Sequence, residues 1–272
     1  MRKRCPEASP KFPSLSNKAV GESSNNTGLA RAISKLGYCS RAQATRLIRR
    51  GKVRLNGAVR RDPETPVRLG QDRIEVEGRP LERAKLFYLA MNKPRGVVTT
   101  ASDEKGRDTV YRYLPAGTPW CSPVGRLDQA SEGLLLFTND TAWANRIAAP
   151  ETHFEKTYHV QIAAIPDEQL LAKLQQGVRT SSGELLRVKS ASLLRHGDKN
   201  SWLDIILDEG KNRQIRRLLE TQNIEVLRLI RVAIGPLQLG ALAKGATRPL
   251  TREEKSLLHR TIRDVKGKTK PD

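Results

Sequence analysis

The sequence predicts an α+β fold, in which a small N-terminal module precedes a larger domain built on a mixed, mostly antiparallel sheet. The chain has 272 residues, of which 38% are hydrophobic, so it can bury a sizeable core and still form a second module. Its first part shows two segments of helical periodicity followed by a hairpin signal. The rest alternates short apolar stretches with helical segments, a pattern typical of an α+β domain.

The two ends of the chain differ in composition from the rest. Residues 1–27 are rich in Ser, Asn, Pro and Lys and contain almost no large apolar side chain, so they cannot offset the entropy lost on ordering. The C-terminal end, VKGKTKPD, has the same character. We therefore expect a disordered basic tail over 1–27, a small module over 28–85, a large domain over 86–258 and a basic tail over 259–272.

The small module is expected to fold as helix, helix and hairpin. Apolar residues at helical spacing predict a first helix that begins near Leu29 and stops at Gly37. Ser40 is expected to cap a second helix, RAQATRLIRR. The pair Asn56-Gly57 between two short alternating segments predicts a tight hairpin turn.

The charge indicates a polyanionic partner. The formal net charge is +20, which suits nucleic-acid phosphates or an anionic membrane surface. Between Gly28 and Arg61 there are ten basic residues and no acidic one. A charge run alone favours a solvated face, but the helix-helix-hairpin context favours phosphate binding. The ten residues are Arg31, Lys35, Arg41, Arg46, Arg49, Arg50, Lys52, Arg54, Arg60 and Arg61.

Several classes of protein are disfavoured by what the sequence lacks. No window approaches the roughly 20 apolar residues of a membrane span, and the N-terminus lacks the apolar block of a signal peptide. Cys5, Cys39 and Cys121 are far apart, and the four His residues also stand separately, so neither a disulfide framework nor a metal site is expected. The protein is therefore expected to be cytoplasmic and free of metal.

The small module resembles a known RNA-binding family. The stretch LARAISKLGYCSRAQATRLIRRGKVRLNG is similar to the alpha-L RNA-binding motif, named after ribosomal protein S-four, and the resemblance covers roughly residues 28–80. In that family the second helix lies against RNA. The resemblance therefore implies RNA contacts from basic residues in and just after this helix, and it implies no catalysis. These residues are Arg41, Arg46, Arg49, Arg50 and Lys52.

The larger domain is expected to combine short strands with interspersed helices. The apolar stretches FYLAMNKP, GLLLFTND, TYHVQIAAI, WLDIILDEG and LRLIRVAIGPLQLG are short and punctuated by Gly, Pro, Asn or Asp, as strands are. The segment DEQLLAKLQQG begins with a capping Asp167 and ends at Gly177. The segment NRQIRRLLETQN carries Ile215, Leu218 and Leu219 on one stripe, which predicts a second helix.

Asp128 stands at the end of a loop that leads directly into a very apolar strand, in the string GRLDQASEGLLLFTND. Without further support, such an Asp is most often a cap or turn residue. The string resembles the signature of pseudouridine synthases of the ribosomal small-subunit and large-subunit type, in which this Asp is catalytic. Three more motifs stand in the family order: NKPRG at 92–96, KTYHV at 156–160 and EGKNRQIRRLLE at 209–220. One departure is Thr141, at a helix start where relatives often have Gly.

The resemblance implies an isomerisation of uridine that needs no cofactor. The bond between the sugar and the base nitrogen breaks, and the sugar rejoins ring carbon-5, for which an ionised carboxylate is a suitable nucleophile. Asp128 would attack either the sugar or the ring. Arg216 would be its cationic partner, although an exposed arginine in a run with Arg213 and Arg217 is the alternative. Tyr158 would stack on the base and take the carbon-5 proton, with core packing as the alternative.

A uridine inside folded RNA must be flipped out before the chemistry. Arg126, two residues before Asp128, is suited to steady the gap, because its guanidinium can stack on bases and contact phosphate. Plain phosphate binding or a structural ion pair is the alternative. Lys93 and Arg213 are also expected to contact RNA, and Lys93 with Pro94 to fix a turn at the rim of the cleft.

Two hypotheses from different classes follow. The first is a monomeric enzyme that acts on ribosomal RNA or a ribosome assembly intermediate, with a lean to the large subunit because NRQIRR lacks a histidine. The second is a non-catalytic RNA-binding factor for ribosome assembly or recycling. A degenerate relative would have lost at least one of Asp128, Tyr158 and Arg216, so their joint presence favours the enzyme. A hydrolytic nuclease is disfavoured because neither a His pair nor a carboxylate cluster is evident.

Overall fold

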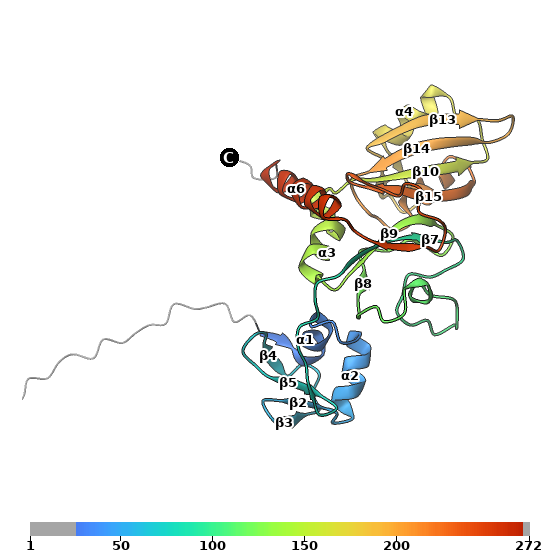
Figure 1. The fold of residues 1–272 in the computed structure, drawn as a ribbon. Coiled ribbons are helices and arrows are strands. Elements are labelled where there is room, and N and C mark those ends of the chain that lie inside the picture. Colours follow the sequence, from blue (N-terminus) through green and yellow to red (C-terminus); the bar gives the residue numbers. More distant parts are fainter. Residues whose placement is uncertain (1–25, 269–272) are drawn as a thin grey trace, which may run out of the picture.

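A computed structural model describes residues 26–268 of the chain. Figure 1 shows a small N-terminal domain beside a larger domain built around one sheet, so the α+β fold with a mixed, mostly antiparallel sheet is confirmed. The expected N-terminal tail lies outside the described residues except for its end, because Asn26–Gly28 forms the first strand, β1. Within 26–268, no helix has the length and apolarity needed to cross a membrane.

The small domain has the expected order of helix, helix and hairpin. The Ser40 hydroxyl accepts a hydrogen bond from the main-chain N–H of Gln43, and the Gln43 side chain accepts one from the main-chain N–H of Ser40. Asn56 and Gly57 both have positive φ, as this two-residue turn requires. The elements are α1 (Leu29–Lys35), α2 (Arg41–Arg49), β2 (Val53–Leu55), β3 (Ala58–Arg60), β4 (Pro66–Arg68), β5 (Ile74–Val76) and β6 (Arg79–Pro80).

The larger domain is organised around a nine-stranded sheet with the order β13-β14-β10-β15-β9-β7-β17, while β16 pairs with β15 and β8 with β9. All pairs are antiparallel except β9 with β15. The strands are β7 (Tyr88–Lys93), β8 (Ser122–Pro123), β9 (Glu132–Thr138), β10 (Lys156–Ile162), β13 (Ser190–His196), β14 (Ser201–Leu207), β15 (Val226–Ile234), β16 (Leu237–Gln238) and β17 (Thr247–Pro249). A separate hairpin is formed by β11 (Val178–Arg179) and β12 (Leu185–Leu186).

Gly133 allows the one parallel pair of the sheet to form. Its φ is +103°, and a Cβ atom here would collide with the main-chain oxygen of Arg231 on β15. Only glycine permits this approach without strain, because it has no Cβ and tolerates positive φ. The pairing brings the start of β9, which follows the Asp128 loop, beside the centre of β15.

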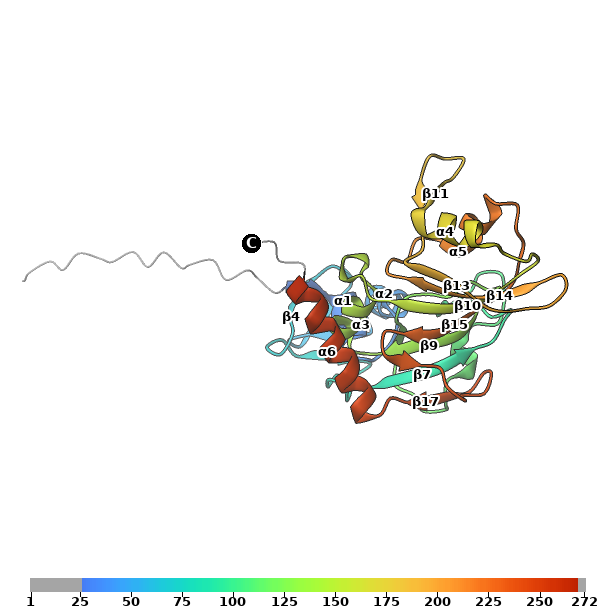
Figure 2. The ribbon, with the colours of Figure 1, turned by 90° about the horizontal axis from the view of Figure 1, so that it is seen from above.

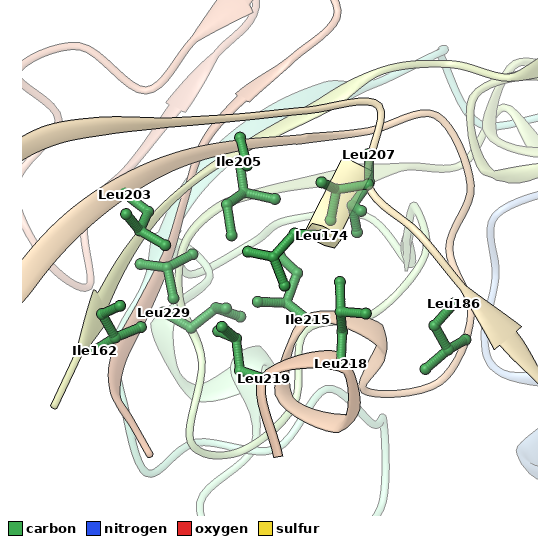
Figure 3. Packing of buried hydrophobic residues seen from close by; sticks show 13 residues of the cluster. Ile162, Leu174, Leu186, Leu203, Ile205, Leu207, Ile215, Leu218, Leu219 and Leu229 are labelled. Atoms are coloured by element: carbon green, nitrogen blue, oxygen red, sulfur yellow. The ribbon is translucent and has the colours of Figure 1, made fainter. Parts of the chain in front are cut away.

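Two helices cover one face at the β13–β14 end of the sheet, as the view from above shows (Figure 2). They are α4 (Glu168–Gln176), capped by Asp167 as expected, and α5 (Gln214–Glu220). In Figure 3 the predicted stripe of α5, with Leu218 and Leu219, faces apolar side chains of β14 such as Leu203 and Ile205. This packing anchors α5 and therefore the arginines that it carries.

The C-terminal region differs from the expected tail. The helix α6 (Arg252–Lys268) continues through residue 259 to the end of the described chain. Leu258 and Ile262 are buried against the cluster that contains Trp143 and Ile147 of α3 (Thr141–Ala148), which explains why the helix persists. Thr141 is indeed a helix start, with Asp140 as the cap. Short 3-10 helices span Val110–Tyr113 and Pro150–Thr152.

Candidate active site

A pocket of about 290 Å³ brings the three expected catalytic residues together. Asp128 comes from the loop before β9, Tyr158 from β10 and Arg216 from α5, and Arg126 and Arg213 also line the pocket. Elements far apart in the sequence therefore meet at one site. Apolar side chains complete part of the wall, namely Val124, Leu127, Ile147, Leu207, Ile215, Leu229 and Ile234.

The Asp128 loop is held by hydrogen bonds on both sides of the carboxylate. The Thr99 hydroxyl donates to the main-chain oxygen of Leu127 at 2.7 Å, and the N–H of Ser131 donates to the main-chain oxygen of Asp128 at 3.0 Å. The Leu127 side chain is buried in the core cluster that contains Met91 and Leu135. The loop thus presents a half-buried carboxylate from a fixed backbone.

Lys93 does not lie where an RNA contact requires it. We expected this lysine to bind RNA, but its side chain is fully buried. Its Nζ donates to the main-chain oxygens of Pro94, Asp128 and Ser131 at 3.0, 3.1 and 2.9 Å, which uses all three of its protons. Burial lowers the pKa of Lys93 to about 8, although the nearby charge of Asp128 opposes this shift. Lys93 therefore supports the Asp128 loop from within.

Arg216 contacts the backbone of the Asp128 loop and forms no direct ion pair with the carboxylate in the described chain. Its guanidinium donates to the main-chain oxygens of Ala130 at 3.1 Å and Val226 at 3.3 Å. Burial and the neighbouring charge of Arg213 lower the pKa of Arg216, while the charge of Asp128 raises it. The charge of Asp128 thus acts on Arg216 through space, and Arg216 holds the backbone of the loop at Ala130. Because the side chain is half-buried, the alternative of an exposed helix arginine is wrong.

Tyr158 lies half-buried between two core clusters. Its ring packs against the cluster under α4 and α5 and also against the one that contains Leu127. Within the described residues its hydroxyl has no hydrogen-bond partner, so this group is free to meet a ligand in the pocket. The side chain thus combines core packing with a place in the pocket wall.

The remaining basic residues of the prediction are exposed. Arg126 lies on the loop at the pocket, and Arg213 stands in left-handed conformation, with φ of 48°, directly before α5. Arg41, Arg46 and Arg49 project from α2 of the small domain. Arg50 and Lys52, which follow α2, are exposed as well.

The sequence analysis missed three cations in the pocket, Lys156, Lys211 and Arg231. Arg231 is only 5% exposed and is the register partner of Tyr158 across β10 and β15. A signal was present in the sequence: Arg231 alternates with Leu229 and Ala233, which both face the core, and a charge at such a position is unusual in a strand. Lys156 precedes Tyr158 by two residues and shares its face.

The donor set of the pocket is that of an anion-binding site. Apart from Asp128, its charged side chains are all cationic. No group of three or more His, Cys, Asp or Glu side chains with metal-binding geometry occurs in residues 26–268. The arrangement can bind a phosphodiester at its mouth and hold one carboxylate against a group inside.

Comparisons with known proteins agree with this geometry. Residues 87–221 match the family model "RNA pseudouridylate synthase", and residues 27–74 match the "S4 domain". The chain is 38% identical to ribosomal large subunit pseudouridine synthase B of Bacillus subtilis (strain 168), over 83% of this chain and 93% of that protein. It is 33% identical to an RNA pseudouridine synthase of Aquifex aeolicus (strain VF5), with coverages of 85% and 92%.

Among solved structures, a pseudouridylate synthase superposes with a TM-score of 0.60 at 30% identity, over 85% of this chain and 99% of that one. The two family models match the chain in the same order as the two domains described above. The chain therefore belongs to the RNA pseudouridine synthase family, as a member with an N-terminal S4 domain.

Proposed function

We propose that this protein isomerises a specific uridine of ribosomal RNA to pseudouridine, with Asp128 as the nucleophile. The observation that carries the proposal is that Asp128 is the single carboxylate lining a pocket that is otherwise cationic, within the described residues. Six cations favour its negative charge by Coulomb attraction. They are Arg126, Lys156, Lys211, Arg213, Arg216 and Arg231.

RNA binding begins at the exposed cations. The basic face of α2, with Arg46 and Arg49, contacts phosphates of the RNA, which positions the substrate without reading its sequence. The target uridine then leaves its stack and enters the pocket, and Arg126 at the pocket loop fills or steadies the gap. Its exposed guanidinium can stack on a base and bind phosphate together.

The chemistry takes place between Asp128 and Tyr158. Asp128 attacks the nucleotide at the sugar or at the ring, the bond between C1′ and N1 breaks, and the ring turns before C5 bonds to C1′. Tyr158 packs against the base, and its unengaged hydroxyl relays the C5 proton: the oxygen accepts this proton while the hydroxyl passes its own proton to solvent. Lys93 and Arg216 keep the loop in place by their hydrogen bonds to Asp128 and Ala130.

The proposed substrate is the RNA of the large ribosomal subunit, either free or in an assembly intermediate. The protein is proposed to act on it in the cytoplasm and as a monomer. The name of the Bacillus subtilis relative refers to that subunit, and the chain covers 93% of that relative. The motif NRQIRR, which lacks a histidine, favours the same choice.

The test is a map of pseudouridines in both ribosomal RNAs from cells with and without this protein. We expect one or a few sites in the large-subunit RNA to disappear and to return when the gene is restored. Loss of a site in the small subunit would correct the choice of substrate. An unchanged map, with the protein bound to ribosomal particles, would favour the non-catalytic assembly factor.

A further inference from the structure

Arg231 is buried and Lys156 is half-buried, and neither cation forms an ion pair within the described residues, although the charge of Asp208 acts on Lys156 from farther away. Lys156 forms no ion pair in the described chain, and burial lowers the pKa of its amine to about 8, helped by the charge of Arg231. Arg231 donates from Nε to the main-chain oxygen of Leu134 at 2.8 Å, but its Nη2 is buried and has no hydrogen-bond partner among residues 26–268. Unpaired buried charge is costly, so an acceptor that a bound ligand brings to these two side chains would be bound favourably.

Both cations lie on the same face of the sheet as Tyr158. Lys156 and Tyr158 are two residues apart on β10, and Arg231 is directly across from Tyr158 on β15. All three line the pocket with Asp128. A ring that packs on Tyr158 therefore has polar edge atoms within the range of these two side chains.

We propose that Lys156 and Arg231 bind the carbonyl oxygens of the target uracil and stabilise the negative charge that the ring acquires during the reaction. The inference rests on the proposed function and deepens it. When the C1′–N1 bond breaks, its electron pair stays on N1 and is delocalised to the ring oxygens. After the new C5–C1′ bond forms and releases Asp128, the C5 proton leaves and N1 gains a proton. If Asp128 adds to the ring first, negative charge again goes to a carbonyl oxygen.

The surroundings favour a base over a phosphate at these cations. Leu207, Leu229 and Ile234 also line the pocket, and Leu207 and Ile234 are the register partners of Lys156 on the two neighbouring strands. Apolar walls suit a ring. The phosphates belong to a continuous RNA backbone that stays outside when a base is flipped. The exposed cations Arg126 and Arg213 are available for them.

The first test is Lys156→Met, because this side chain makes no hydrogen bond in the described chain and its removal should not disturb the fold. The substrate is ribosomal RNA from cells that lack the protein, labelled with tritium at C5 of uridine, so that isomerisation releases the label. We expect kcat to fall about 100-fold with nearly unchanged RNA affinity. Lys156→Arg should recover most of the rate. Lys173→Met, an exposed lysine of α4, is the matched control and should behave as wild type.

A second measurement separates charge stabilisation from positioning. In RNA that carries 5-fluorouridine, the fluorine already stabilises the negative charge that the ring acquires. Cleavage of the C1′–N1 bond of this nucleotide should therefore depend less on Lys156. We follow the loss of 5-fluorouridine from the digested RNA and expect a clearly smaller defect of Lys156→Met than with uridine. An equal defect on both substrates would overturn the proposal, as would a variant that loses only RNA affinity, the result for a phosphate site. Wild-type protein inactive on all of this RNA would instead refute the proposed function.

Discussion

The ammonium group of Lys93 donates a hydrogen bond to the main-chain oxygen of Asp128, 3.1 Å away, from a position with no exposed surface. The same group holds the oxygens of Pro94 and Ser131, so one side chain joins the end of β7 to both ends of the short segment 128–131. The geometry of the proposed nucleophile therefore depends on a residue that never meets the substrate.

Lys93→Met should lower kcat strongly while it lowers the free energy of unfolding only moderately. The change leaves three carbonyl oxygens without their donor, and even a small displacement of Asp128 costs turnover, so we expect kcat to fall by about 100-fold. Stability should change by no more than about 3 kcal/mol, because removal of a buried charge offsets part of the lost hydrogen bonding. The measurements are tritium release and urea unfolding. Wild-type turnover in a folded variant would show that the loop needs no such support.

Lys156→Met should stabilise the protein in a manner that depends on pH. The folded pKa of about 8 lies below the usual value near 10.4, so the unfolded chain binds more protons between these values and this lysine makes stability rise with pH. The loss of stability caused by covering the charged amine of Lys156 is fully present below pH 8. The variant should thus be more stable near neutral pH, by at most about 3 kcal/mol and less after solvent screening. The gain should shrink towards pH 10; a gain independent of pH would contradict the assignment.

Gly133→Ala should destabilise the large domain strongly. The added Cβ would meet the backbone of Arg231, and φ is +103°, so we expect a loss of about 3 kcal/mol or more in urea unfolding. Gly183→Ala is the matched control, because φ there is +81° but the added Cβ would meet nothing. It should cost only about 1 kcal/mol. Equal losses at the two positions would mean that the close approach of β9 and β15 is unimportant.

The basic face of α2 should determine much of the salt dependence of RNA binding. The double variant Arg46→Gln with Arg49→Gln removes two exposed cations, and each phosphate contact contributes about 0.7 to 0.9 to the logarithmic salt slope. We expect a slope lower by about 1.5. The control replaces Lys173 and Lys199, exposed lysines of the large domain, by Gln and should leave the slope nearly unchanged. A slope that falls in the Lys173 and Lys199 control but not in the Arg46 and Arg49 variant would assign the phosphate contacts to the large domain.

The features that sequence alone predicted correctly are those encoded locally. Ser40 and Asp167 cap their helices, and Asn56-Gly57 turns the hairpin, because each depends on a few neighbouring residues. Asp128 and Tyr158 were found through motifs. Their meeting in one pocket depends on the pairing of β9 and β10 with β15.

The features that the sequence did not reveal depend on burial between segments that are far apart in the chain. Lys93 stands in a polar motif, and only the packing of the Asp128 loop against β7 encloses it. Arg231 was overlooked because it lies within an apolar strand, although a charged residue at an inward-facing position is unusual. The helix beyond Leu258 was missed because the polar end of the chain hides the apolar contact of Ile262.

The central claim, that Asp128 carries out the reaction, is tested most directly by Asp128→Asn. The substitution keeps the shape of the side chain but removes its charge and nucleophilicity. We predict an unchanged melting temperature and RNA affinity, with no tritium released from labelled ribosomal RNA and no pseudouridine at the mapped site. Turnover near the wild-type rate in this variant would contradict the account.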